Sequence, residues 1–167
     1  MVSGRYIKII VDDAYYNAGW YLTTIPEIEI YDTNNTNVAL NKTVTVSGYY
    51  DSTNTPALKI VDGTKVYSTW KDAWVSQNVK ADGTNVWCQI DLGLIVNLNK
   101  IRLYKFTSMA NNQGYASLKS YKIFVSTDGT IWGNPYLIIV NEADGIKNDG
   151  TDYKEYAFVK IRYLIYL

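Results

Sequence analysis

The clearest structural signal in this sequence lies in residues 120–129, Ser-Tyr-Lys-Ile-Phe-Val-Ser-Thr-Asp-Gly. Within this run apolar side chains occupy every second position, Tyr121, Ile123 and Val125, and an Asp-Gly pair follows them. Successive side chains of a β-strand point to opposite faces, so the alternation predicts a strand with one buried face that ends in a tight turn.

The same two features recur along the whole chain, and no stretch carries a sustained helical stripe. Further alternating runs are Ile28 and Ile30; Val44 and Val46; Ile101 and Leu103; and Val159, Ile161, Tyr163 and Ile165. Between them lie turn clusters such as Asp62-Gly63 and Asn148-Asp149-Gly150. A chain of 167 residues with 47% apolar content can bury one core. The sequence therefore predicts a single all-β domain of two packed sheets.

Composition excludes several classes of function. The chain has no histidine and one cysteine, Cys88, so the usual general base and zinc ligands are missing. The 16 basic and 16 acidic residues balance, which argues against a nucleic-acid partner, and no apolar run is long enough to span a membrane. The carboxylates of Asp12 and Asp13 point to opposite faces if they lie on a strand, a poor arrangement for glycoside hydrolysis. We therefore expect no enzyme, and the 16 Tyr and 5 Trp favour a binding role.

Six motifs occur in the order typical of the factor V/VIII type C, or discoidin, family. They are Asn37 to Lys42; Ala57 to Gly63; Ser68-Thr69-Trp70; Trp87 to Gly93; Ile101-Arg102-Leu103; and Ser120 to Gly129 with Trp132. From Val38 to about Tyr163 the chain resembles this family, which includes the family 32 carbohydrate-binding modules, and its galactose-binding-like members are the nearest type. The resemblance implies a jelly-roll β-sandwich of two antiparallel sheets, without catalytic machinery. It also implies a location outside the cell or on its surface, within a larger multidomain secreted protein.

The strand order departs from the family pattern. The family ends with a strand resembling Arg-Tyr-Ile-Lys-Ile and a final strand with a glutamate, and here both occur first, at Arg5 to Ile10 and Ile25 to Tyr31. The run Phe158 to Tyr163 is similar to the first of them. We expect residues 1–36 to supply the final strands to a main body of residues 37–167, within one domain spanning 1–167. Alternatively, residues 1–36 close a preceding repeat, and a strand-exchanged dimer is a further possibility.

The resemblance also implies a structural calcium ion. Asp62, Thr64 and Ser68 match the loop that holds calcium in the family, and Glu27 occupies the place of the glutamate from the final strand. Calcium takes six to eight hard oxygen ligands, which such a glycine-containing loop and two carboxylates can provide. The alternative is an ordinary turn with a solvated glutamate at a sheet edge.

The sugar-binding branch of the family suggests the ligand contacts. By this resemblance Trp70 is the core tryptophan and Trp74 the exposed platform on which a sugar stacks, with Lys71 beside it. The other expected contacts are Lys105, Asn111, Asn112 and Trp20. A flat ring beside amides and cations suits a sugar, which has an apolar face and a rim of hydroxyls. Lysines in place of the family's histidine and arginine leave open whether the glycan is galactose-type or another sugar.

A role in cell-surface or protein adhesion is the main alternative, because the same fold carries both functions. Loop residues such as Tyr49, Tyr50 and Met109 could serve as apolar contacts with a lipid surface, but the loops lack the cluster of cations that anionic headgroups require. A membrane partner is therefore not expected.

Overall fold

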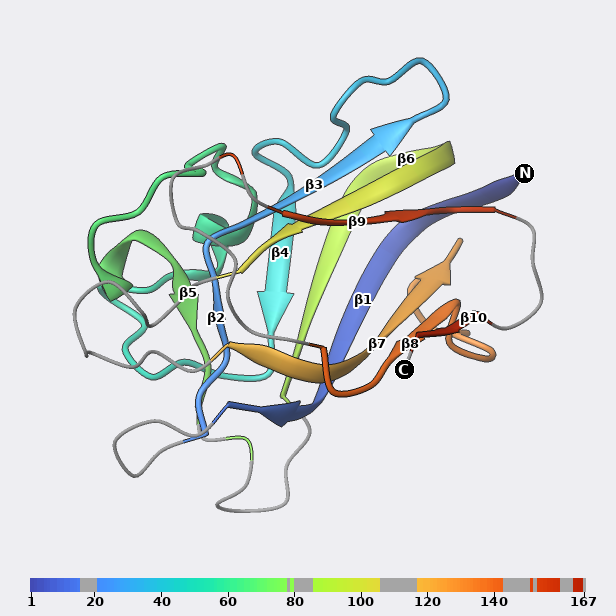
Figure 1. Ribbon diagram of the computed structural model, residues 1–167. Coiled ribbons are helices and arrows are strands. Elements are labelled where there is room, and N and C mark those ends of the chain that lie inside the picture. Colours follow the sequence, from blue (N-terminus) through green and yellow to red (C-terminus); the bar gives the residue numbers. More distant parts are fainter. Residues whose placement is uncertain are drawn as a thin grey trace.

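The structure is a computed structural model that describes residues 1–15, 21–77, 79, 86–105, 117–142, 151 and 153–159, together with the backbone of residues 164–166. Regular structure in these residues is almost entirely β. Eight strands form one hydrogen-bonded sheet and two short strands form another. The larger sheet folds over on itself into two layers, so the predicted all-β sandwich is confirmed (Figure 1).

The first layer is built around β1 (Val2–Ala14), which lies between the first part of β6 (Val86–Tyr104) and β7 (Leu118–Ser126). The layer continues on one side with β4 (Thr43–Val46), which pairs with β6. On the other side are β8 (Leu137–Ile139) and β10 (Leu164–Tyr166), and β10 runs parallel to β8. The run that opened the sequence analysis thus forms β7, as its alternation predicts.

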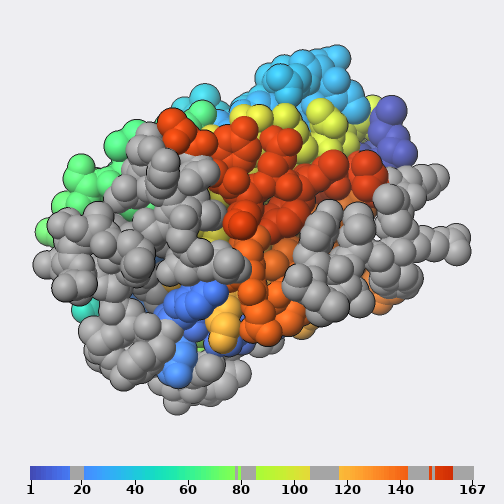
Figure 2. Space-filling model, viewed as in Figure 1, coloured from blue at the N-terminus to red at the C-terminus, as the bar shows by residue number. Residues whose placement is uncertain are grey.

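The second layer has β6 in its centre as well. Its last residues pair with β3 (Glu27–Asp32) on one side and with β9 (Lys154–Ala157) on the other. Figure 2 shows residues of β9 at the molecular surface, next to those of β6. β6 bulges at residues 92–95, where it passes from the first layer to the second. The bulge is seen in the register with β1, which shifts from Tyr6–Asp91 to Gly4–Val96. Gly93 has a φ of +86° there, a conformation that favours glycine.

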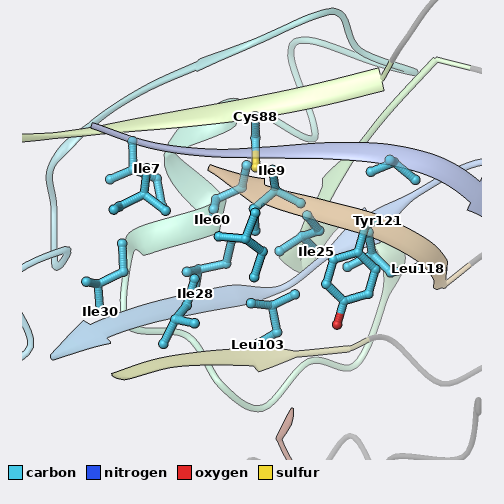
Figure 3. Close-up of a cluster of buried hydrophobic side chains, with 14 of the residues drawn as sticks. Ile7, Ile9, Ile25, Ile28, Ile30, Ile60, Cys88, Leu103, Leu118 and Tyr121 are labelled. Carbon is cyan, nitrogen blue, oxygen red and sulfur yellow. The ribbon is translucent and has the colours of Figure 1, made fainter. Parts of the chain in front are cut away.

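The core lies between the two layers. Ile7, Ile9 and Cys88 of the first layer face Ile28 and Leu103 of the second (Figure 3). All of them are at most 1% exposed, which is the burial that the alternating pattern predicts. Burial raises the pKa of the Cys88 thiol to about 12, so this cysteine is a small core residue and not a nucleophile.

The N-terminal motifs form two strands of the sandwich. β1 and β3 both pair with β6, so residues 1–36 supply strands to the same sandwich as the residues that follow them. The short linker at residues 32–36 predicts that residues 25–31 pair beside the strand entered through Val38. The observed contact consists of the Tyr31–Asn37 bridge, a bond from the Val38 amide to the Ile30 carbonyl and a bond from the Ile30 amide to the Asn37 side chain, and β3 forms its ladder with β6 instead. Of the similar run at 158–163, residues 160–163 lie outside the described part.

One end of the sandwich carries the short elements. They are β2 (Thr24–Ile25), which pairs with β5 (Trp74–Val75), and the 3₁₀ helices η1 (Ala57–Val61) and η2 (Trp70–Asp72) (Figure 1). The candidate site residues that the sequence singles out at Asp62, Thr64, Ser68, Lys71 and Trp74 lie within or between these elements.

Candidate functional site

The structure reverses the predicted roles of the two tryptophans. Trp74, expected to be an exposed platform, is 0% exposed in β5, and its indole nitrogen donates a hydrogen bond of 3.2 Å to the Gly48 carbonyl. Trp70, expected in the core, is only partly buried. The prediction is therefore wrong for both residues. The physical reason is the 3₁₀ turn of η2 between them, which changes the direction of the side chains before β5 pairs with β2.

Trp70 instead belongs to an exposed group of aromatic and basic side chains. Its ring meets the ring of Tyr50 edge to face, with centroids 5.8 Å apart and an interplanar angle of 87°. The ammonium of Lys71 lies 5.7 Å from the Trp70 ring centroid. Tyr50 is 56% exposed and the adjacent Tyr49 39%. We call Tyr49, Tyr50, Trp70 and Lys71 the loop aromatic surface.

A capping box holds η2 and thereby positions Trp70 and Lys71. The hydroxyl of Thr69 accepts a hydrogen bond of 3.2 Å from the Lys71 amide. The carboxylate of Asp72 reaches back to the amides of Ser68 and Thr69, at 2.8 and 3.0 Å. A capping box satisfies backbone donors at the start of a helix and fixes how the chain enters it. The side chains at the start of η2 are thus held by local chemistry.

A second turn holds Tyr50. The Tyr50 amide donates to the Val75 carbonyl at 2.9 Å, which ties this loop to β5. The next residue, Asp51, accepts hydrogen bonds from the amides of Thr53 and Asn54 and from the Asn54 side chain. These bonds, first of all the one from the Asn54 side chain, lower the pKa of Asp51, so it stays a carboxylate at neutral pH. The loop aromatic surface, with its flat rings and one cation, is thus followed directly after Tyr50 by a carboxylate and a side-chain amide that bond to each other.

The remaining predicted sugar contacts fall outside this surface. Lys105 is 1% exposed, and its ammonium is held 2.8 Å from the Glu142 carboxylate, which also accepts a hydrogen bond from the Tyr121 hydroxyl. A lysine enclosed in this way does not reach a ligand at the surface, so the prediction for Lys105 is wrong. Trp20, Asn111 and Asn112 lie outside the described residues.

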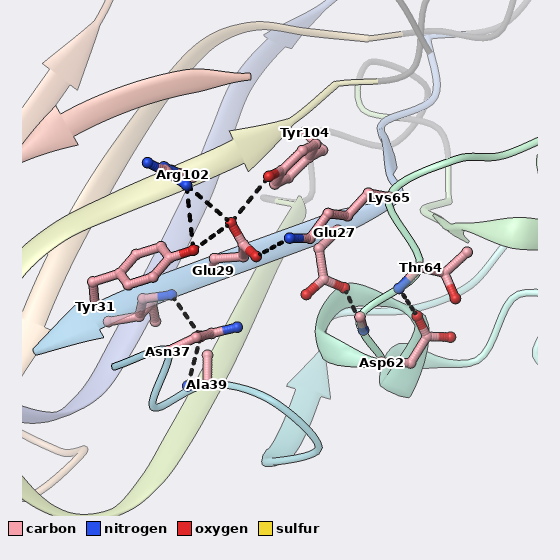
Figure 4. A network of polar contacts seen from close by, with 12 residues as sticks. Glu27, Glu29, Tyr31, Asn37, Ala39, Asp62, Thr64, Lys65, Arg102 and Tyr104 are labelled. Atoms are coloured by element: carbon pink, nitrogen blue, oxygen red, sulfur yellow. Dashed lines mark hydrogen bonds and ion pairs between the residues drawn. The ribbon is translucent and has the colours of Figure 1, made fainter. Parts of the chain in front are cut away.

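The predicted calcium ligands Glu27, Asp62 and Thr64 lie together (Figure 4). Glu27 is 0% exposed, and its Oε2 accepts a hydrogen bond of 3.0 Å from the Gly63 amide, whereas its Oε1 is buried without a partner. Burial is the main cause that raises the pKa of Glu27 to about 8. Asp62 accepts a bond from the Thr64 amide at 2.8 Å and contacts the ammonium of Lys59 at 3.3 Å.

Glu29, on the same strand as Glu27, is a buried carboxylate in which both oxygens have partners. It is 3% exposed, and it accepts hydrogen bonds from the hydroxyls of Tyr31 and Tyr104 at 2.9 and 3.0 Å and an ion pair from Lys65 at 2.6 Å (Figure 4). Burial raises the pKa of Glu29, but these partners outweigh burial and hold it below its usual value. Residues 27 and 29 share one strand face, and the contrast shows that Glu27, unlike Glu29, forms no ion pair with the described residues.

The arrangement around Glu27 fits a hard cation. A buried carboxylate oxygen without a partner is costly, and a cation would remove that cost. The described residues contain no group of three or more His, Cys, Asp and Glu side chains that could hold a metal. An ion here would therefore need backbone carbonyls and hydroxyls beside Glu27 and Asp62, which is the ligand chemistry of calcium. The amide of the fourth predicted ligand, Ser68, belongs to the capping box of η2.

Comparison with known proteins gives one match. The family model of the F5/8 type C domain matches residues 43–164, which is most of the chain. No curated protein and no solved structure matches this chain. Within the described residues, no helix has the length and apolar character needed to cross a membrane.

Proposed function

Because the chain belongs to the F5/8 type C, or discoidin, family, whose domains are in general non-catalytic modules that bind carbohydrate or protein, we propose that it binds a glycan through the loop aromatic surface. Domains of this family are typically extracellular, and we place this chain outside the cell or on its surface, within a larger secreted protein.

One observation supports the proposal above the others: the exposed ring of Tyr50 meets the partly buried ring of Trp70 edge to face, beside the ammonium of Lys71. A sugar presents an apolar face that packs on an aromatic ring, and a rim of hydroxyls that need fixed donors and acceptors. The Asp51 carboxylate, which follows Tyr50 in the chain, and the Asn54 side chain, which donates a hydrogen bond to it, provide such groups on the same loop as Tyr50.

A glycan array with the intact chain tests this proposal. We expect binding to a restricted set of glycans, and loss of that binding in Trp70→Ala and Tyr50→Ala with folding retained. The matched control is Trp132→Ala, which removes a half-buried tryptophan from the segment between β7 and β8. If the intact protein binds no glycan, or if Trp132→Ala weakens binding as much as Trp70→Ala, the proposal is wrong.

We also propose that a structural calcium ion binds beside Glu27, with Asp62, Thr64 and Ser68 in the loop that follows η1. When bound, the ion supplies positive charge to the buried carboxylate; Glu27 ties β3 to this loop through the Gly63 amide. A ligand that binds only the folded state stabilises it by about 2.7 kcal/mol at 100 times its dissociation constant.

Chelation tests the metal assignment. EDTA should lower the melting temperature of the wild-type protein, and added calcium should restore it. Glu27→Gln should remove this response, whereas the control Glu155→Gln, which changes an exposed carboxylate on β9, should keep it. A melting temperature that EDTA leaves unchanged contradicts the proposal.

Protein or cell-surface adhesion is the second candidate, and a different feature favours it. Leu94 and Ile95 in the bulge of β6 are 61% and 57% exposed. Exposed apolar side chains that lie together mark sites of protein contact. An intact protein that is silent on the glycan array but loses attachment to cells in Leu94→Asp would support this function instead.

A further inference from the structure

The segment between β3 and β4 carries a modification motif in two copies. Residues 34–36 read Asn-Asn-Thr, and residues 41–43 read Asn-Lys-Thr. An asparagine followed two positions later by serine or threonine, with no proline between them, is the acceptor sequence for N-linked glycosylation, a modification of surface loops in secreted proteins. The motif occurs at these two places and nowhere else in the sequence. The fold holds the two copies in different ways.

The first copy has side chains that the fold does not use. Asn34 and Thr36 are both exposed. Their backbone amides donate to one carboxylate oxygen of Asp32, at 2.9 Å each, and the Thr36 carbonyl accepts from the Asp32 amide at 3.0 Å. Backbone groups and Asp32 therefore hold this turn. The Asn34 carboxamide and the Thr36 hydroxyl make no hydrogen bond to another described residue.

The bonds within this turn are local. The Asn35 amide also donates to Asp32, to its carbonyl at 3.0 Å, so the three residues of the motif all bond back to one neighbour. The bond from the Thr33 amide to the Asn97 carbonyl, at 3.1 Å, reaches β6 but lies before the motif. An acceptor peptide must leave the protein surface to enter the active site of a transferase. Here it can do so without separating two strands.

The second copy is built into the sheet. Asn41 is exposed as well, but its amide donates to the Val61 carbonyl at 2.8 Å. Thr43 is the first residue of β4 and lies opposite Asp91 of β6. Lifting residues 41–43 from the surface would break contacts with two distant segments. The second copy therefore has the same motif and the same exposure of its asparagine, but a different attachment to the fold.

The first copy lies away from the loop aromatic surface. It follows the six residues of β3, and the other end of β3 leads back to β2, which pairs with β5. A strand of this length spans about 20 Å. Figure 1 shows the turn after β3 at the end of that strand remote from β5, and Figure 2 shows this light-blue segment projecting from the molecular surface. An oligosaccharide at this turn would leave the loop aromatic surface open.

We propose that Asn34 is an acceptor site for N-linked glycosylation and that Asn41 is not modified in the folded protein. In the reaction, the Asn34 carboxamide nitrogen forms a bond to the anomeric carbon of an oligosaccharide carried by a polyprenyl diphosphate. The bond from that carbon to the diphosphate oxygen breaks, the lipid diphosphate leaves, and the nitrogen loses one proton to a base. The transferase recognises the motif through the Thr36 hydroxyl. The inference rests on the proposed location outside the cell, and it is independent of glycan binding by the loop aromatic surface.

Glycosylation of the purified, folded chain tests the site directly. The protein is incubated with a single-subunit oligosaccharyltransferase and a synthetic polyprenyl-diphosphate oligosaccharide, and mass spectrometry of the intact protein detects the product. A standard acceptor peptide in the same mixture verifies that the enzyme is active. We expect the wild type to gain one oligosaccharide and Asn34→Gln to gain none. The matched control Asn41→Gln should be modified like the wild type.

Thr36 provides a second pair of variants. Thr36→Val removes the hydroxyl with little change of shape at an exposed position and should abolish the modification, whereas Thr36→Ser should retain it. A folded wild type whose mass does not change refutes the proposal, as does a mass increase that persists in Asn34→Gln. Two oligosaccharides on the folded wild type would overturn the distinction between the two copies.

Trp70→Ala keeps this test separate from that of the proposed function. The substitution should remove glycan binding by the loop aromatic surface and leave the modification of Asn34 at the wild-type level. A wild type that is modified at Asn34 but binds no glycan would refute the proposed function alone. A wild type that binds glycans but is not modified would refute the assignment of Asn34 alone.

Discussion

At the scale of single residues, Trp74 contributes to the stability of the core and Trp70 to the candidate binding surface. Trp74 is 0% exposed and packs in the core, while Trp70 faces Tyr50 at the surface. Truncation of a buried tryptophan costs about 3–5 kcal/mol, a large part of the usual stability of a domain. We expect Trp74→Ala to lower the free energy of unfolding by this amount and Trp70→Ala to lower it far less. Denaturant unfolding of both variants measures the difference, and equal losses would contradict the assignment.

Glu27 should give the calcium-free protein a distinctive pH dependence. Its pKa is raised from 4.5 to about 8 in the folded state, so the folded protein holds this proton more tightly than the unfolded chain does. The stability from this group is complete below pH 4.5 and is lost as the pH rises towards 8. Each pKa unit corresponds to about 1.4 kcal/mol.

The measurement is denaturant unfolding in EDTA between about pH 5 and 8. The free energy of unfolding of the wild type should fall across this range relative to that of Glu27→Gln, which cannot ionise. If the two proteins change in parallel with pH, burial does not perturb Glu27 in the folded state.

At the scale of elements, η2 links fold and candidate function. It is a single 3₁₀ turn of three residues, so its capping box provides much of what holds it in place. Asp72→Ala removes the acceptor for the amides of Ser68 and Thr69. We expect a loss of about 1 kcal/mol in stability and a larger relative loss of glycan affinity, because Trp70 and Lys71 are no longer held.

Asp72→Asn serves as the control for Asp72→Ala, since its amide oxygen still accepts hydrogen bonds from the two backbone amides. Glycan binding by titration and stability by unfolding are compared for both variants. Affinity that Asp72→Ala retains in full would show that η2 does not position the binding residues.

At the scale of the whole molecule, the N-terminal strands are integral to the sandwich. Removing residues 1–36 takes away β1, which lies between two strands of the first layer, and β3, which carries Glu27. The exposed apolar edges would favour association with other chains. We expect residues 37–167 to give no cooperative unfolding transition and to aggregate in size-exclusion chromatography. A truncated protein that is monomeric and equally stable would assign residues 1–36 to a different domain.

The sequence alone was enough for the class of fold and for the family. Strand alternation depends only on the local geometry of an extended chain, so it predicted that Tyr121 and Ile123 of β7 are buried, whereas Val125 at the end of the alternating run is only partly buried. The absence of histidine was equally visible, and six short motifs in order led to the family that the comparison then matched at residues 43–164.

Only the tertiary structure decided which side chains face the solvent in the short elements. Trp74 is buried because β5 pairs with β2, and Lys105 is enclosed because Glu142, distant in sequence, lies beside its ammonium. Glu27 stands out as a carboxylate with one oxygen that lacks a partner only when compared with Glu29, whose partners come from three separate segments. Alternation repeats locally and can be read along the chain, whereas exposure at a turn depends on partners that folding brings together.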